Sequence, residues 1–387
     1  MTATRTHFYL LFALVASICW GCSADETIDA PKGGLRNDST IHFAVTTETV
    51  EEEASTRAEL FNSTEAFATE GRKFSVCAYD YREDIGEQLM IGSQTGTTVT
   101  GVDVTCHVSD DNGVTSTNWT TGDHYYWPQI SHTVRFYAVY PQTTFSKTSS
   151  DVTFDFDASE ERLDNDDIGD PLMAYLAMGR TEARDYDYAA PLHFRHALSK
   201  ISFTATTSEP GWTLTVNSIT VHNLYDKGHI GIRNGTMAPS SLATSARTFT
   251  MTNNQAEAQV VLPQKRAAWQ PGFYFISQND AFATTDTLAT GTYLAIECAI
   301  WNGSAYKLGT GTGADNITTY QTIYCPVAPD WQPNTHYRYI LNFRAPGYGN
   351  AAYNEEGGPI YDVASVALTA TVIADWSNGE SSEVHVK

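Results

Sequence analysis

Short runs in which apolar and polar residues alternate recur along the whole chain, and Gly, Asn, Asp and Pro separate them. Alternation with a period of two gives a β-strand one apolar face, and these four residue types end strands. No helix-period segment of ordinary length competes with them, so the sequence predicts an all-β protein. Because an isolated sheet must bury one face against another layer, antiparallel β-sandwiches are the economical architecture.

Two of these runs meet back to back in Pro191–Thr204. Leu192 and Phe194 alternate with polar neighbours in the first run, and Ile201 and Phe203 do so in the second. About half of the chain lies on each side of this stretch. We therefore expect it to join two β domains, an N-terminal one over residues 41–195 and a C-terminal one over residues 196–387.

One expected strand, Thr213–Val221, changes parity near Asn217-Ser218, which predicts a β-bulge there. The remaining expected strands are Ile41–Thr46, Phe74–Tyr81, Val99–Val108, His124–Trp127, Thr133–Tyr140, Gln259–Leu262, Phe273–Ser277, Tyr293–Trp301, Thr318–Cys325, His336–Phe343 and Ala367–Trp376.

The charge of the chain limits its partners. Its 23 Lys and Arg residues against 45 Asp and Glu residues give a formal net charge of −22. Such a charge repels nucleic-acid phosphates and anionic membrane surfaces. We therefore expect no nucleic-acid partner.

The N-terminus carries a targeting pattern. Arg5 precedes the apolar run Phe8–Cys19, which is too short to span a bilayer comfortably, so residues 1–21 are predicted to be a signal peptide. Gly21 directly before Cys22 resembles a bacterial lipobox, in which the cysteine thiol is acylated. Residues 22–40 are polar and are expected to form a flexible tether.

Four cysteines remain after Cys22, two in each half: Cys77, Cys106, Cys298 and Cys325. An exported protein could form one disulfide per domain from them. They could equally be small buried apolar residues, since sequence does not give the Cα spacing that a disulfide needs.

No catalytic, metal or cofactor site assembles from the sequence. His193 and His196 are three residues apart, which places them on opposite faces of a strand. The acidic run that includes Asp164, Asp166, Asp167 and Asp170 does not follow a calcium-loop pattern and is expected to be a solvated loop. Gly309–Ala314 matches a loose dinucleotide-binding pattern, but no helix is expected to follow it. The chain is therefore predicted not to be an enzyme.

Aromatic residues give a second interpretation. They are suited to stacking on sugars, although the cores of sandwiches also need such residues. The candidates are Tyr125, Tyr126, Trp127, Trp301, Trp331 and Trp376.

A series of short motifs resembles the fimbrillin family, the type V pilin-like lipoproteins of the Bacteroidetes. The most telling is His196-Ala197-Leu198-Ser199-Lys200-Ile201 within Leu192–Ile201. The others, in order, are the lipobox cysteine, a first strand ending near Thr56-Arg57-Ala58, Tyr126-Trp127-Pro128 before Val134–Ala138, Asp170–Ala174, Trp331–Tyr337 and Val372–Trp376.

The resemblance implies two tandem transthyretin-like antiparallel β-sandwich domains and export to the outer membrane through a lipid on Cys22. It also implies proteolysis between Arg57 and Ala58, which would remove the first strand. Ile41, Phe43 and Val45 would fill a hydrophobic groove before this cleavage, and a strand from another subunit would fill it afterwards. The strand Ala367–Trp376 and the tail to Lys387 are both candidate donors.

The resulting expectation is a structural subunit of a surface fimbria that serves adhesion, with other fimbrial subunits as partners and a host glycan or protein as a further ligand. Two alternatives stay open: a surface glycan-binding lipoprotein, and an anchor or tip subunit that does not polymerise.

Overall fold

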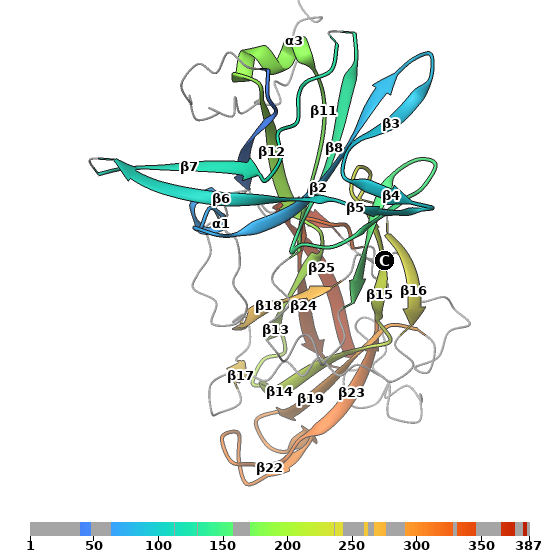
Figure 1. Ribbon diagram of the computed structural model, residues 1–387. Coiled ribbons are helices and arrows are strands. Elements are labelled where there is room, and N and C mark those ends of the chain that lie inside the picture. Colours follow the sequence, from blue (N-terminus) through green and yellow to red (C-terminus); the bar gives the residue numbers. More distant parts are fainter. Residues whose placement is uncertain are drawn as a thin grey trace, which may run out of the picture.

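The computed structural model describes residues 39–47, 63–111, 113–129, 131–157, 171–235, 237–242, 259–261, 267–275, 291–327, 331–345, 365–375 and 382–384. These residues form β-strands with a few single helical turns, which confirms the all-β prediction (Figure 1). The helical turns are α1 (Thr64–Phe67), α3 (Arg180–Ala183) and η1 (Arg184–Tyr186).

The first half of the chain closes one sheet into a ring. Strand β2 pairs with β6 along one edge and with β8 along the other, so the order β2-β6-β7-β1-β12-β11-β8 returns to β2. Strand β3 pairs with the second half of β2, on the same edge as β6. The strands are β1 (His42–Thr47), β2 (Lys73–Arg82), β3 (Gly86–Ile91), β6 (Val102–Asp111), β7 (Val114–Thr121), β8 (Thr133–Tyr140), β11 (Leu172–Gly179) and β12 (Ala189–His196).

A second sheet packs against the outside of this ring. Its order is β16-β15-β10-β9-β5-β4. Tyr137 and Met173 of the ring share a buried cluster with Phe145, Phe154 and Ile230 of this sheet. The strands are β4 (Ser93–Thr95), β5 (Thr98–Thr100), β9 (Phe145–Lys147), β10 (Val152–Asp157), β15 (Tyr225–Gly231) and β16 (Met237–Leu242).

The second half forms a sandwich of two five-stranded sheets. One sheet has the order β18-β13-β24-β25-β26, and the other has the order β17-β14-β19-β20, with β23 also on β19. Phe203 and Leu341 of the first sheet share a buried core with Leu214, Ile296 and Ile323 of the second. The strands are β13 (Ser199–Thr207), β14 (Thr213–His222), β17 (Gln259–Val261), β18 (Ala267–Phe275), β19 (Tyr293–Trp301), β20 (Tyr306–Leu308), β23 (Gln321–Pro326), β24 (Thr335–Arg344), β25 (Ser365–Asp375) and β26 (Ser382–Val384), next to the small pair β21 (Thr310–Gly311) and β22 (Ile317–Thr319).

The chain passes from the ring to the sandwich at the stretch that the sequence singles out, because β12 ends at His196 and β13 begins at Ser199. The hairpin β15–β16 then returns to pair with β10 in the first half. The bulge predicted in β14 is confirmed by a register shift between Val216 and Ser218. The strand expected at His124–Trp127 is wrong, because only Tyr126 forms an isolated bridge there, with Thr40.

Candidate functional site: the position of the first strand

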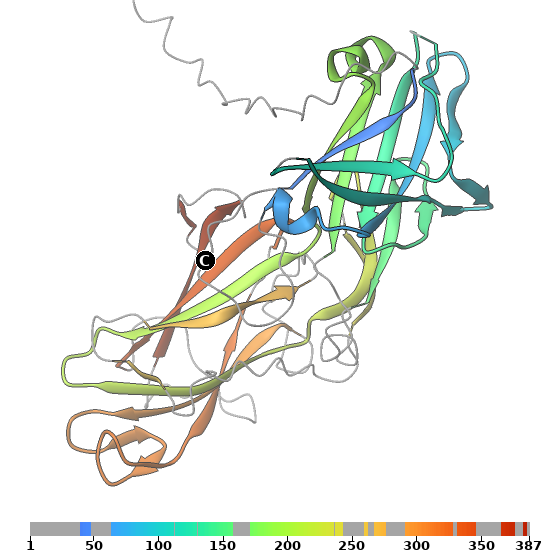
Figure 2. The same ribbon diagram turned by 60° about the vertical axis from the view of Figure 1, so that its left-hand side comes forward.

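Strand β1 is part of the wall of the ring. It pairs in parallel with β12 over six residues, from His42 opposite Ala189 to Thr47 opposite Phe194. On its other edge it meets β7 in antiparallel orientation at Phe43 opposite Trp119. Figures 1 and 2 show this dark blue strand beside β12. The ring is therefore continuous only while a strand occupies this position.

The apolar side chains of this first segment fill the core of the ring. Ile41, Phe43 and Val45 are 4%, 6% and 7% exposed and belong to one buried cluster. The phenyl group of Phe43 lies edge-on to the phenyl groups of Phe74 and Phe136, and the centroids are 6.3 and 6.0 Å apart. The three residues that the sequence predicts as groove-filling are thus brought together in one core.

Backbone hydrogen bonds hold the start of the segment on the side of β7. The Ile41 N–H donates to the Tyr125 carbonyl at 2.7 Å, and the Trp127 N–H donates to the Ser39 carbonyl at 3.1 Å. These two bonds explain why the aromatic residues before Pro128 lie extended without forming a strand of their own.

The Tyr188 carbonyl holds the same end on the side of β12. It accepts from the His42 N–H at 3.3 Å and from the indole Nε1–H of Trp127 at 2.9 Å. Asp187 and Tyr188 both have left-handed φ angles, 51° and 63°, which are uncommon for residues other than glycine and form the turn that leads into β12. The sequence does not reveal these two hydrogen bonds to Tyr188. An indole that donates to a backbone carbonyl 61 residues away leaves no periodic pattern in the sequence.

Helix α1 closes the other end of the segment. The Thr47 N–H donates to Thr64 Oγ1 at 3.0 Å, and the Thr64 hydroxyl donates to the Thr47 carbonyl at 3.4 Å. Three residues later, the ring of Phe67 stacks on Trp119, with centroids 5.5 Å apart and planes 21° apart. Phe67 has no exposed surface, so α1 seals the core where β1 leaves it.

The structure does not place the lipidation and cleavage residues that the sequence predicts. Cys22, Arg57 and Ala58 lie outside the described residues. Of the two candidate donors, β25 lies between β24 and β26 in its own sheet, and the described part of the tail forms β26 at the edge of that sheet.

The four cysteines are buried free thiols, each at most 5% exposed. Burial raises the pKa of all four, to about 11 for Cys106 and about 12 for Cys325. The sequence leaves open whether these cysteines form disulfides or act as small buried apolar residues. In the structure they are buried apolar residues and form no disulfide with one another.

We expect Cys77, Cys106, Cys298 and Cys325 to resist iodoacetamide in the native protein and to react once it is unfolded, because only an accessible thiolate is alkylated. Peptide mass mapping after labelling under both conditions measures this. Non-reduced peptides that link Cys77 to Cys106, or Cys298 to Cys325, would contradict it.

The other sequence candidates do not form a chemical site. His193 is exposed and His196 is 1% exposed, on opposite faces of β12. The Gly309 motif forms the turn and strand β21, with Gly309 at a φ of 76°. Within the described ranges no group of three or more His, Cys, Asp or Glu residues could hold a metal ion, and no helix is long and apolar enough to span a bilayer. The acidic run 164–170 lies outside those ranges.

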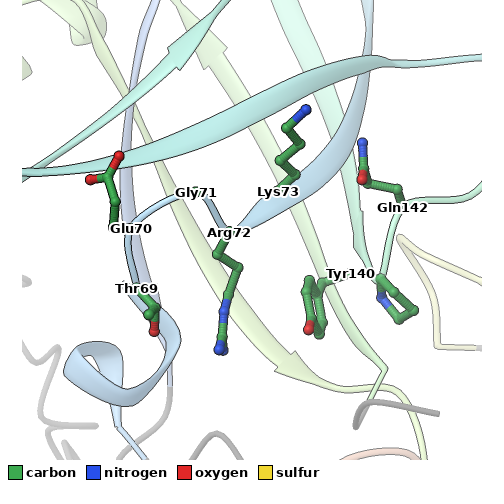
Figure 3. A pocket seen from close by; sticks show the side chains of 8 residues that line it. Thr69, Glu70, Gly71, Arg72, Lys73, Tyr140 and Gln142 are labelled. Carbon is green, nitrogen blue, oxygen red and sulfur yellow. The ribbon is translucent and has the colours of Figure 1, made fainter. Parts of the chain in front are cut away.

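An open depression of about 440 Å³ lies beside α1, at the start of β2 and the end of β8 (Figure 3). Arg72 borders it, and its guanidinium lies 5.8 Å from the ring centres of both Phe67 and Tyr140. Arg72 also donates to the Ala66 carbonyl at 3.3 Å. These contacts give Arg72 a structural role in holding α1 against the ring.

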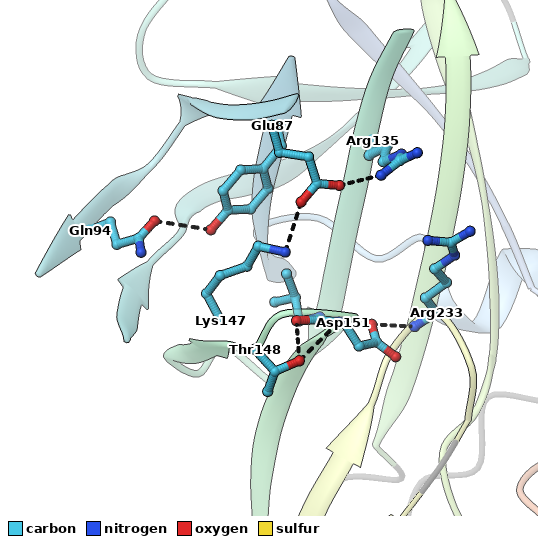
Figure 4. A network of polar contacts seen from close by, with 9 residues as sticks. Glu87, Gln94, Arg135, Lys147, Thr148, Asp151 and Arg233 are labelled. Carbon is cyan, nitrogen blue, oxygen red and sulfur yellow. Dashed lines mark hydrogen bonds and ion pairs between the residues drawn. The ribbon is translucent and has the colours of Figure 1, made fainter. Parts of the chain in front are cut away.

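A partly buried ion-pair network joins β3, β8 and β9 (Figure 4). Glu87 binds Arg135 and lies 2.8 Å from Lys147 Nζ. Burial alone would raise the pKa of Glu87, but the hydrogen bonds and charges of Lys147 and Arg135 outweigh it and lower the pKa below its ordinary value of 4.5. Asp151, in the same view, is 3% exposed and accepts from the backbone N–H of Arg233 at 3.1 Å, which ties β10 to the end of β15.

This network predicts a pH dependence. Because the folded pKa of Glu87 is lowered, its stabilisation is complete above the unfolded value of 4.5 and is lost as the pH falls through the folded value. Wild type should therefore melt at a clearly higher temperature than Glu87→Gln at pH 7, and the gap should shrink below about pH 4. Thermal unfolding of both proteins across this range tests it, and a gap that stays constant with pH would exclude the ion pair as its source.

Comparison with known proteins agrees with this architecture. Residues 56–376 match the fimbrillin-like family. The fold is similar to that of a fimbrial protein from Bacteroides vulgatus, with 15% identity, a TM-score of 0.51, and coverage of 87% of this chain and 99% of that one. The tip fimbrial protein Mfa3 from Porphyromonas gingivalis, solved with a C-terminal truncation, aligns with 10% identity and a TM-score of 0.37 over 87% of this chain and 100% of its own. No curated protein matches the sequence. Since the family match spans most of its length, the chain belongs to the fimbrillin-like family.

Proposed function

We propose that this chain is a subunit of a cell-surface fimbria that assembles when its first strand is cut away and a strand of another subunit takes its place. The cut would fall between Arg57 and Ala58 and would release β1 with everything before it. Membership of the fimbrillin-like family gives the chain a fimbrial and adhesive role, not an enzymatic one. Association with other subunits and a place at the cell surface follow from the same membership.

One observation carries the strand-replacement proposal: β1 completes a closed ring and fills its core. Without this strand, the ladder partners of β1 on β12 would lose six residues of pairing. The pocket around Phe43 would be left open beside Phe74 and Phe136. Unpaired strand edges and exposed apolar pockets both favour the addition of a new strand.

We place the donor at the C-terminus. Removing β25 would take a strand from the middle of its sheet, whereas β26 pairs only with β25 among the described strands. Releasing the tail, which includes Ser382–Val384 and ends at Lys387, therefore costs less free energy than releasing β25. We take the tail as the donor. Val384 and Val386 alternate there, as Phe43 and Val45 do in β1.

The export pathway and the domain boundaries complete the proposal. Residues 1–21 would be the signal peptide, and a lipid on Cys22 would hold the precursor at the outer membrane through a tether. The tether predicted over 22–40 would end before Ser39, because Ser39 and Thr40 are bonded to Trp127 and Tyr126. The two domains, over 41–195 and 196–387, would each be of the transthyretin-like type.

Limited digestion with an Arg-specific protease tests this function. The folded, unacylated protein and its Arg57→Lys variant are digested and then compared by intact mass and by size-exclusion chromatography. We expect one early cut after Arg57, loss of the β1 fragment and growth of oligomers in wild type, and none of these in the variant. If wild type loses the fragment but stays monomeric, a tip or anchor subunit replaces the polymerising one. If Arg57 resists cleavage while the fold is intact, strand replacement at this site is wrong.

A further inference from the structure

The sheet formed by β14, β19 and β23 has an outer face that differs from an ordinary solvated sheet surface. In β19, Leu294, Ile296, Cys298 and Ile300 point into the sandwich core. Tyr293, Glu297 and Trp301 alternate with them and therefore lie on the outer face. They are half-buried and spaced about 13 Å apart along the strand, at about 3.3 Å per residue.

Aromatic rings form a row across the three strands at one end of this face. His222 of β14 stacks on Tyr293 with centroids 4.5 Å apart and planes 7° apart. Tyr324 of β23 meets the same tyrosine edge-on at 5.7 Å. Burial lowers the pKa of His222, so at neutral pH its imidazole is an uncharged ring. All three side chains are half-buried and present part of their surface to solvent.

A positioned carboxylate lies on the same face, four residues along β19 from Tyr293. Glu297 Oε2 accepts from Asn217 Nδ2–H at 2.6 Å and from the Ser218 hydroxyl at 3.1 Å. The bulge in β14 lies at these two residues, and two neighbouring side chains thus reach one oxygen. Among the described residues no donor binds the other oxygen, Oε1, which can therefore accept from a ligand.

The charge of the face limits that ligand. Strands β14, β19 and β23 contain no Lys or Arg, and the chain as a whole carries a formal charge of −22. A sialylated, sulphated or phosphorylated ligand would be repelled by Glu297 and by this overall charge. A neutral ligand with hydroxyl donors and apolar C–H faces has no such penalty. The negative face of an aromatic ring attracts C–H groups, and a few fixed polar groups set the orientation.

We infer that this face binds a neutral oligosaccharide, whose sugar rings lie on Tyr293 and its aromatic neighbours and whose hydroxyls donate to Glu297. The face lies at the far end of the molecule from the ring that holds β1 in both views (Figures 1 and 2). Filling the position of β1 therefore does not involve this face. The inference does not depend on strand replacement.

An array of neutral oligosaccharides with their sialylated and sulphated counterparts tests the inference, with the full-length folded protein as analyte. The best neutral glycan is then titrated into wild type, Tyr293→Ala, Glu297→Gln and Tyr186→Ala. Tyr186 is a matched control, because it is a partly exposed tyrosine, 37% exposed, in η1 of the first half.

We expect at least one neutral glycan to bind and both face variants to weaken it by about tenfold or more, while Tyr186→Ala binds as wild type does. Glu297→Gln keeps the size of the side chain and so tests the carboxylate even if Tyr293→Ala is poorly folded. Binding confined to acidic glycans, binding that survives both face variants, or no binding across the array would each overturn the inference. None of these outcomes bears on cleavage at Arg57, so the two proposals fail separately.

Discussion

Replacing Phe43 with alanine should lower the free energy of unfolding of the uncleaved chain by about 3–5 kcal/mol, the range for a fully buried phenylalanine. Phe43 is 6% exposed and its ring meets Phe74 and Phe136 edge-on, so its removal leaves a cavity that rigid aromatic neighbours cannot fill. Chemical denaturation of both proteins measures the difference.

The proposed function adds a sharper expectation for the same variant. If residues 1–57 leave before assembly, the assembled form no longer contains residue 43, and Phe43→Ala should assemble into particles as stable as those of wild type. Thr46→Ala is the control within β1, since it removes only an exposed hydrogen bond to His193 and should cost below about 1 kcal/mol. Assembled particles weakened by Phe43→Ala would show that β1 stays in place.

Replacing Phe67 with alanine should destabilise the chain by a similar amount, about 3–5 kcal/mol, both before and after cleavage. Phe67 lies on the C-terminal side of Arg57 and therefore stays with the subunit. It has no exposed surface and packs on Trp119, Tyr140 and Phe194.

Unfolding of the uncleaved chain and of the cleaved, assembled form measures this second effect. Glu65→Gln, on the exposed surface of the same helical turn, is the control and should change neither. A Phe67→Ala protein that is weakened before cleavage but not afterwards would mean that α1 leaves its place when β1 does.

Two strands have the bounds that the sequence predicts, Thr133–Tyr140 and Tyr293–Trp301. Both are runs rich in apolar and aromatic residues, and Pro141 directly follows the first of them. The bulge at Asn217-Ser218 was also predictable, since an extra residue reverses the parity of everything after it. Local patterns were sufficient in these cases.

Other elements could not be predicted from local patterns. Strand Leu172–Gly179 is buried on both faces at its start, so apolar and polar residues do not alternate there. Strand Val114–Thr121 has only one buried residue and therefore shows no apolar face in the sequence. The parallel pairing of β1 with β12, and that of β13 with β24, joins segments more than a hundred residues apart along the chain. The aromatic run at His124–Trp127 has strand-like composition but bonds to Ser39 and Ile41 at single points.

The parallel pairing of β1 with β12 has a mechanical consequence. A strand that occupied this position in the same direction, and was pulled along its own axis, would load the ladder in shear. All the hydrogen bonds between that strand and residues Ala189 to Phe194 of β12 would then bear the force together. When a strand is instead pulled away sideways, its hydrogen bonds break one after another. A fibre joined in this way would resist tension most strongly along its length.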